Sequence, residues 1–168
     1  DALPICAIHQ EGQLAKAASL AYYGVLNYDG IPGFNIGGSL FQGGIAQKQT
    51  IPSPNASVTL AEVHTKWQVG AWDLAALAAQ GRFRDVGAFN ASANGLNNPV
   101  PDQFRGWYAQ AAYRLWRQGD YSLVPFARYE RVNTALSFSG LPVGLTPAVD
   151  PDTRVWTVGA NFYLHPQV

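Results

Sequence analysis

Charged side chains at alternating positions are the first feature of this 168-residue sequence that could do chemistry. They form short rows, with Glu62, His64 and Lys66 in one and Arg128 and Glu130 in another. A row of fixed charges beside water attracts or repels small ions. The simpler explanation for any single residue is pairing, Lys66 with Glu62 and Arg128 with Glu130, worth about 0–1 kcal/mol per hydrated pair. As a set, the charges still predict one polar surface.

Other kinds of site are not predicted. His64 and His165 have no carboxylate or cysteine at ligand spacing, so a metal site is not expected. No Ser-His-Asp arrangement or nucleophile elbow is present, and "NIGG" and "QGG" do not precede a helix that would hold a phosphate. The two "NAS" stretches, at Asn55–Ser57 and Asn90–Ser92, only match the glycosylation pattern. We expect neither an enzyme nor a bound cofactor.

The composition excludes several other classes. Charged residues make up 13% of the chain, about half of the ~25% usual in soluble domains. The formal net charge is zero, which predicts no general attraction to nucleic acid or to anionic lipid. The single cysteine, Cys6, excludes an internal disulfide framework and a four-cysteine metal site. No apolar run reaches the ~18 residues of a membrane helix.

Apolar and polar residues alternate along most of the chain, and this period of two predicts strands. Most of these are about 10–13 residues long, about twice the usual ~5–6, whereas strands that cross a membrane need about 9–11. The seven predicted strands cover residues 18–29, 33–43, 56–69, 71–81, 104–116, 121–132 and 153–165.

The links between these strands alternate between short and long. An up-and-down barrel in an outer membrane has tight periplasmic turns and longer outer loops, whereas loops of ~20 residues are uncommon in compact soluble domains. The short links are "GIPG" (Gly30–Gly33), Gly70 and "RQGD" (Arg117–Asp120), and the long ones are Gly43–Asn55, Gly81–Asp102 and Asn133–Asp152.

One set of alternate positions is apolar with aromatic ends. Tyr121 and Tyr129 are eight residues apart, about 27 Å along a strand, or roughly 20 Å of membrane thickness at a tilt of ~40°. This spacing suits two aromatic girdles at the boundaries between lipid and water. The predicted girdle residues are Trp67, Trp72, Trp107, Tyr113, Tyr121, Tyr129 and Trp156.

The opposite set of positions is polar and is predicted to line a water-filled lumen. Strand 71–81 is ambiguous, and we assign Trp72 outward and Asp73 inward. Arg82 and Arg84 follow at a loop base, from which they are expected to reach a constriction. Pro125 cannot donate to a strand ladder and predicts a local bulge. The predicted pore-lining residues are Glu62, His64, Lys66, Asp73, Gln110, Arg114, Arg128, Glu130 and Asn161.

Four stretches resemble the later strands of a known family: "GIPGFNIGGSLF", "GWYAQAAYRLW", "SLVPFARYERVNT" and "VWTVGANFYLHPQV". They are similar to the porin family that includes the phosphate-selective porins O and P, over residues 15 to 168. The resemblance implies a large, often trimeric barrel in the outer membrane of a Gram-negative bacterium, which passes small hydrophilic solutes, ions or anions by diffusion. Phosphate specificity does not carry over, because the inward basic residues are few and mixed with acidic ones.

The predicted fold is therefore all-β: an antiparallel up-and-down transmembrane β-barrel, present here as an incomplete segment of about seven strands. Residues 15–168 would be the partial barrel domain, and residues 1–14 are unassigned, with a start, "DALPIC", that is expected to be non-native. The absent methionine and the odd strand number predict a piece of a longer chain with open sheet edges. The expected partners are outer-membrane lipid and small solutes, with no nucleic acid.

A second class of protein, a soluble binding module, also fits the alternation of apolar and polar residues. In a soluble β-sandwich binding module, the Trp and Tyr side chains would stack on sugars. In that fold the apolar face would pack against a second sheet, so the covering of this face separates the two hypotheses.

Overall fold

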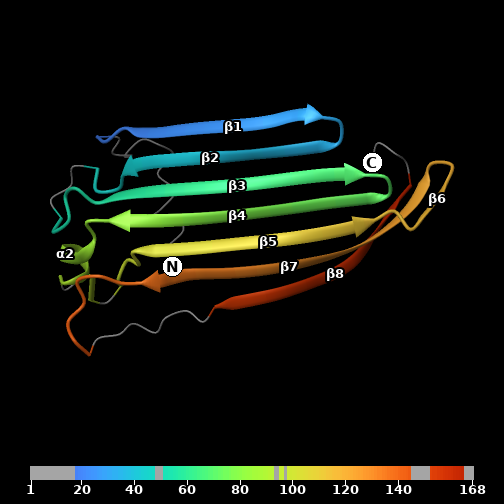
Figure 1. Cartoon of the computed structure of the whole chain (residues 1–168). Helices are drawn as coiled ribbons and strands as arrows, with labels where there is room; N and C mark the ends of the chain where they lie inside the picture. The colour runs from blue at the N-terminus through green and yellow to red at the C-terminus, as the bar shows by residue number, and fades with distance from the viewer. Residues whose placement is uncertain (1–17, 48–50, 93–94, 97, 145–151, 165–168) are drawn as a thin grey trace, which may run out of the picture.

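The computed structural model describes residues 18–47, 51–92, 95–96, 98–144 and 152–164. It is an all-β structure in which eight antiparallel strands form one open sheet (Figure 1). A short helix, α2 (Gly87–Asn90), lies in the link between the fourth and fifth strands. The predicted segment 1–14 and His165 lie outside the described residues. Within the described ranges, no helix is both long and apolar enough to span a membrane.

The strands lie close to the predicted ranges, and seven of them are 11 to 17 residues long. Their order in the sheet follows the chain, with β8 beside β7 and the short β6 also paired with β7. In chain order they are β1 (Ala21–Ile31), β2 (Phe34–Gly44), β3 (Ser57–Val69), β4 (Trp72–Arg84), β5 (Gln103–Tyr113), β6 (Trp116–Gln118), β7 (Tyr121–Ser137) and β8 (Thr153–Tyr163).

The links confirm the predicted alternation. Two-residue links join β1 to β2, β3 to β4 and β6 to β7, and each contains a glycine with positive φ: Gly33 at 77°, Gly70 at 60° and Gly119 at 60°. Residues with a side chain rarely adopt a positive φ, so glycine suits these tight turns. These turns join the strands at one end, which we call the turn end. The long links and α2 lie at the opposite end of the strands, the loop end (Figure 1).

The predicted strand 104–116 is divided into β5 and β6, and the division lies beside Pro125. Ala112 is opposite Phe126, but Trp116 is opposite Leu123. Three residues, 113–115, therefore face only two, 124–125. The structure confirms the irregularity predicted at Pro125 and places the extra residue on the neighbouring strand. On the other side of β7 the register with β8 continues unbroken past Pro125.

The two outermost long strands leave the sheet open, as predicted. Among the described residues, β1 pairs only with β2 and β8 only with β7. Every residue of these two strands is exposed. Each strand therefore presents one row of backbone groups that no described strand pairs.

Cross-strand register places the predicted outward residues on one side of the sheet, which we call the apolar face. Leu74 lies opposite Ala111, which lies opposite Ala127, which lies opposite Val158. Trp72 is on the same face, opposite Val69 and Tyr113, so the ambiguous strand is oriented as predicted. The apolar face includes Leu26, Ile36, Val63, Trp67, Trp72, Leu74, Trp107, Ala111, Ala127, Tyr129, Trp156 and Val158.

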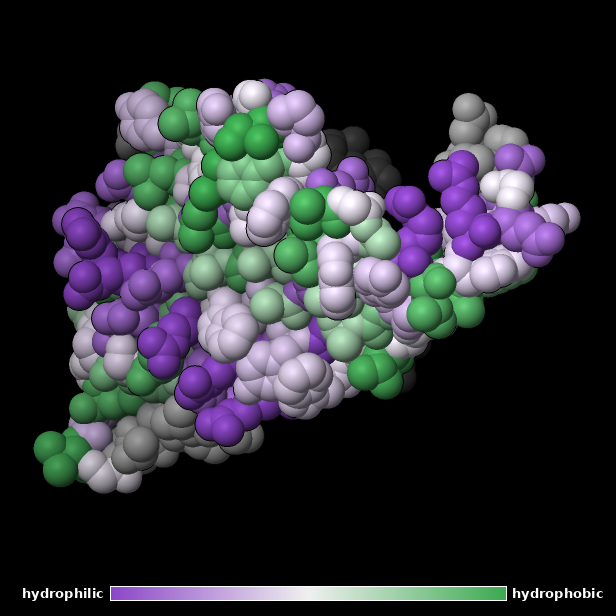
Figure 2. Space-filling view, turned by 45° about the vertical axis from the view of Figure 1, so that its right-hand side comes forward, coloured by the Kyte–Doolittle hydropathy of each residue, from purple (hydrophilic) through white to green (hydrophobic). Residues whose placement is uncertain are grey.

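This apolar face is open to its surroundings in the described part of the chain. Leu26 is 80% exposed, Val158 76% and Trp156 71%. Figure 2 shows a broad area of hydrophobic and weakly polar residues over the middle of the sheet, with strongly hydrophilic residues concentrated towards its ends. No second layer of described residues covers these side chains.

Candidate functional site

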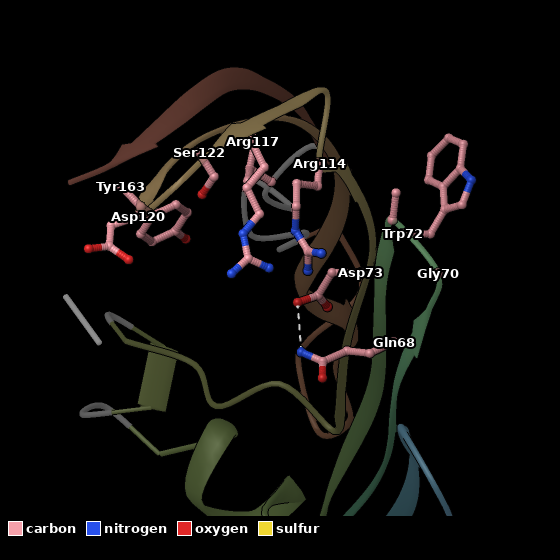
Figure 3. A pocket seen from close by; sticks show the side chains of 11 residues that line it. Gln68, Gly70, Trp72, Asp73, Arg114, Arg117, Asp120, Ser122 and Tyr163 are labelled. Atoms are coloured by element: carbon pink, nitrogen blue, oxygen red, sulfur yellow. Dashed lines mark hydrogen bonds between the residues drawn. The ribbon is translucent and has the colours of Figure 1, made fainter. Parts of the chain in front are cut away.

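The opposite side of the sheet, which we call the polar face, carries the predicted pore-lining residues. One cross-strand row runs from Lys66 past Ala75 to Gln110, Arg128 and Thr157. Glu62, His64, Asp73, Glu130 and Asn161 share this face through the strand alternation and register. Arg114 follows β5 and projects to the same side as Asp73 (Figure 3). All nine residues therefore border one surface.

Most of these charges pair with a neighbour. The guanidinium of Arg128 is 2.7 Å from Glu130, as predicted, and lies 3.8 Å from the centre of the Tyr108 ring. The predicted pairing of Lys66 with Glu62 is wrong. Lys66 instead lies 3.7 Å from Asp73, which is brought close by the β3–β4 hairpin. These pairs place oppositely charged groups side by side along the polar face.

Glu62 has partners of its own. Its Oε1 lies 2.6 Å from Nδ1 of His64, two residues along the same strand. The hydroxyl of Ser39 on β2 donates a hydrogen bond of 3.0 Å to its Oε2. The carboxylate is thus held from two strands, and its position on the polar face is well defined.

A hollow of about 520 Å³ lies on the polar face at the turn end. In Figure 3, Arg114 and Arg117 project towards Gln68 and Asp73, whereas Trp72 projects to the other side of the sheet. Gln68 donates a hydrogen bond of 3.2 Å to Asp73. Arg117 was not among the predicted pore-lining residues, because residue 117 was expected in a turn. Arg117 lies opposite Ser122 in β6, a pairing that only the register of the sheet shows.

At the loop end, three long links meet in a cluster held by one asparagine. Asn90 is 0% exposed. Its amide nitrogen donates to the carbonyl groups of Val100 and Ser139, both at 2.9 Å, and its Oδ1 accepts from the Val100 N–H at 2.8 Å. The Phe89 N–H donates to the hydroxyl of Ser53 at 2.8 Å. We call Ser53, Phe89, Asn90, Val100 and Ser139 the loop cluster.

The loop cluster lies over one side of the sheet. Its links leave β2, β4 and β7, and β3 and β5 lie between these strands. In Figure 3, α2 lies on the side towards which Arg114 and Asp73 project. The loop cluster therefore reaches over the polar face. The sequence did not single out Asn90 for this role, because its partners are 10 and 49 residues away.

The seven predicted girdle residues form two clusters on the apolar face, one at the turn end and one further towards the loop end, where Trp107 is level with Ala78 in the middle of β4. Towards the loop end, Tyr129 lies between Trp107 and Trp156, with ring centres 5.3 and 4.8 Å apart. At the turn end, the rings of Trp72 and Tyr113 are 4.8 Å apart. We call Trp107, Tyr129 and Trp156 the loop-end aromatic cluster, and the turn-end aromatic cluster is Trp67, Trp72, Tyr113, Trp116 and Tyr121.

The predicted orientation of Arg82 and Arg84 is wrong. Arg82 lies opposite Thr59 and Gln103, and Arg84 lies opposite Ser57. Both alternate with Phe83 and share the face of Trp72, not that of Asp73. They therefore extend the apolar face towards the loop end and do not approach the polar face as predicted.

Among the described residues, no three His, Cys, Asp or Glu side chains converge as metal ligands would. No protein-family model matches this sequence. It is similar to an uncharacterized protein of Aquifex aeolicus (strain VF5), with 24% identity over 173 residues, or 98% of this chain. The chain spans only 38% of the length of that relative.

Proposed function

We propose that this chain forms part of the wall of an outer-membrane β-barrel channel that passes small hydrophilic solutes and ions by diffusion. The proposal agrees with the resemblance to the porin family that includes the phosphate-selective porins O and P. The observation that carries it is the division of one sheet into an exposed apolar face, with two aromatic clusters, and a polar face that carries paired charges.

A lipid bilayer is the environment that best suits the apolar face. Soluble monomers rarely expose apolar patches larger than a few hundred Å², whereas here the exposed side chains extend from β1 to β8. Acyl chains would cover the small and branched residues between the aromatic clusters, and the rings would lie at the lipid–water boundaries. Further strands beside β1 and β8 would pair the open edges, because unpaired backbone groups are not tolerated in lipid.

The polar face supports a weakly selective pore. Its basic side chains, Lys66, Arg114, Arg117 and Arg128, are matched by the acidic side chains of Glu62, Asp73, Asp120 and Glu130. This balance favours a general diffusion channel over an anion filter. The loop cluster, which reaches over this face, would narrow the channel near its outer mouth.

The sandwich alternative needs a second layer on the apolar face. Val158 and Trp156 are among its most exposed residues, and no described segment covers them. The sugar-binding hypothesis also gives no reason for the apolar residues between the two aromatic clusters to be exposed. We therefore favour the membrane channel.

Tryptophan fluorescence tests the lipid contact directly, because all five tryptophans lie on the apolar face. In the full-length gene product reconstituted in phosphatidylcholine vesicles, brominated acyl chains are expected to quench most of the emission. Aqueous iodide is expected to quench little of it. The opposite pattern, strong quenching by iodide and none by brominated lipid, would reject the membrane proposal.

Reversal potentials in planar bilayers test the role of the polar face. Arg128→Gln leaves Glu130 without its partner and is expected to shift permeability towards cations. Glu130→Gln is expected to shift it towards anions. Each shift should be up to about fivefold, because a unit charge at about 4 Å in water is worth about 1 kcal/mol. Identical reversal potentials in both variants and the parent would exclude this pair from the ion pathway.

A further inference from the structure

Three neighbouring strands, β5, β7 and β8, each carry an arginine and an aromatic residue towards the loop end of the apolar face. In each, an arginine stands two positions from an aromatic residue, on the side towards the long links. Residues two apart on a strand share a face and are about 7 Å apart. The pairs are Arg105 with Trp107 on β5, Arg131 with Tyr129 on β7, and Arg154 with Trp156 on β8.

The register brings these arginines into one group. Arg131 lies opposite Arg154 on β8 and opposite Trp107 on β5. Arg105 lies opposite Asn133, two residues beyond Arg131. The three guanidinium groups therefore border the loop-end aromatic cluster as a continuous patch, which we call the arginine patch (Arg105, Arg131 and Arg154).

One carboxylate, Asp152, lies within the arginine patch and forms an ion pair with Arg131. The hydrogen bond from Arg131 is the main cause that lowers the pKa of Asp152, and the charges of Arg131, Arg154 and Arg105 lower it further. All three arginines are thus close enough to act on a single carboxylate. Within the described residues, Arg105 and Arg154 form no ion pair. The patch keeps an excess of two positive charges.

The arginine patch borders a hollow that could receive a ligand group. Its volume is about 210 Å³, and Arg105, Trp107, Arg131, Asn133 and Asp152 line it. The hollow thus combines the Arg105 guanidinium, the Arg131 guanidinium with its partner carboxylate Asp152, an amide and the edge of the aromatic cluster. Guanidinium groups bind phosphate through paired hydrogen bonds, so a phosphate oxygen is the acceptor that best fits this set.

We propose that the arginine patch binds the phosphate group of a membrane lipid at the loop end of the barrel wall. The inference rests on the proposed function, because it takes the apolar face to contact lipid. A lipid is favoured over a solute because the patch lies on the side of the sheet away from the polar face and directly beyond an aromatic cluster. Cationic side chains at this depth attract anionic headgroups, while the aromatic rings contact the upper acyl chains.

The experiment uses two reporter variants of the full-length gene product in phosphatidylcholine vesicles. In both reporters, every tryptophan outside residues 1–168 is changed to phenylalanine. The loop-end reporter keeps Trp107 and Trp156 and also changes the other three tryptophans of this chain to phenylalanine. The turn-end reporter keeps those three and changes Trp107 and Trp156 to phenylalanine. Quenching by a small fraction of brominated phosphatidic acid is compared with quenching by the same fraction of brominated phosphatidylcholine.

The loop-end reporter is expected to prefer phosphatidic acid by at least about fivefold, the preference that one arginine near a membrane surface provides. The turn-end reporter is expected to show no preference, because the described residues of the turn-end aromatic cluster have no charged neighbour on the apolar face. Arg105→Gln with Arg154→Gln should abolish the preference at the loop end. Arg114→Gln with Arg117→Gln, on the polar face, is the matched control and should retain it.

The outcomes separate the inference from the function on which it rests. Quenching by brominated phosphatidylcholine without any preference for phosphatidic acid would overturn the lipid site and leave the channel proposal intact. No quenching by either brominated lipid would overturn both. If millimolar inorganic phosphate displaced brominated phosphatidic acid, the patch would be a site for soluble phosphate, which also overturns the lipid assignment. Quenching by brominated phosphatidylcholine at the parent level shows that the double variants are folded and inserted.

Discussion

Replacing Ala111 by arginine is expected to destabilise the folded, membrane-inserted protein by about 2–4 kcal/mol. Ala111 lies on the apolar face between Leu74 and Ala127. It is four residues from Trp107 and two from Tyr113, and therefore lies between the two aromatic clusters. An arginine there would bring a charge into the acyl chain region. Urea unfolding of the full-length gene product in phosphatidylcholine vesicles would measure the loss.

The adjacent residue provides the control. Gln110 belongs to the same strand but to the polar face, opposite Arg128. Gln110→Arg would place like charges side by side at a hydrated surface, and its expected cost is below about 1 kcal/mol. Equal losses of unfolding free energy in the two variants would contradict the assignment of the faces to lipid and water.

Replacing Asn90 by alanine is expected to release the loop cluster and to cost about 3 kcal/mol of local stability. The change removes three hydrogen bonds and leaves the Val100 N–H and the carbonyl groups of Val100 and Ser139 without this partner. Each buried polar group left unpaired costs about 1–3 kcal/mol. Limited proteolysis of the reconstituted protein would measure the release, through faster cleavage in residues 85–102 and in the link after β7.

The same substitution has an expected effect on the channel. Because the loop cluster reaches over the polar face, its release should increase single-channel conductance or current noise in planar bilayers. Asn55→Ala is the matched control, since Asn55 is exposed in the β2–β3 link and should change neither quantity. Unchanged proteolysis in Asn90→Ala would show that Asn90 does not hold the loops together. Faster proteolysis with unchanged conductance would place the loop cluster away from the ion pathway.

The faces of the strands were predictable because strand alternation is a local property. Consecutive side chains point to opposite sides of a sheet, so Trp107, Ala109 and Ala111 share a face in any register. The glycines of the short links were equally informative, because a two-residue turn needs a residue with positive φ. The open edges were predicted from an odd number of strands, but the sheet has eight, because the predicted strand 104–116 divides into β5 and β6. The edges are open because β1 and β8 each pair on one side only among the described residues. None of these predictions required knowledge of the neighbouring strand.

The residues that were missed depend on contacts between distant parts of the chain. Lys66 pairs with Asp73 because the β3–β4 register brings them together, and the spacing to Glu62 alone suggested otherwise. Arg117 was predicted in a turn, but it belongs to β6 because that short segment pairs with β7. Arg82 was oriented inward because the predicted strand ended at residue 81, whereas β4 continues to Arg84 and its alternation continues with it.

The arginine patch shows the limit of arguments from composition. A net charge of zero predicted no attraction to anionic lipid, but charge acts over about 10 Å or less in physiological salt, so local arrangement decides. Arg105, Arg131 and Arg154 are 23 to 49 positions apart in the chain and become neighbours only in the sheet.

Local alternation and turn chemistry thus determine which side chains share a face and where the chain reverses, since both are written within a few residues. Which side chains meet, as in the arginine patch and the loop cluster around Asn90, is decided by register and by the packing of long links. These contacts join residues far apart in the chain, so no short stretch of sequence contains them.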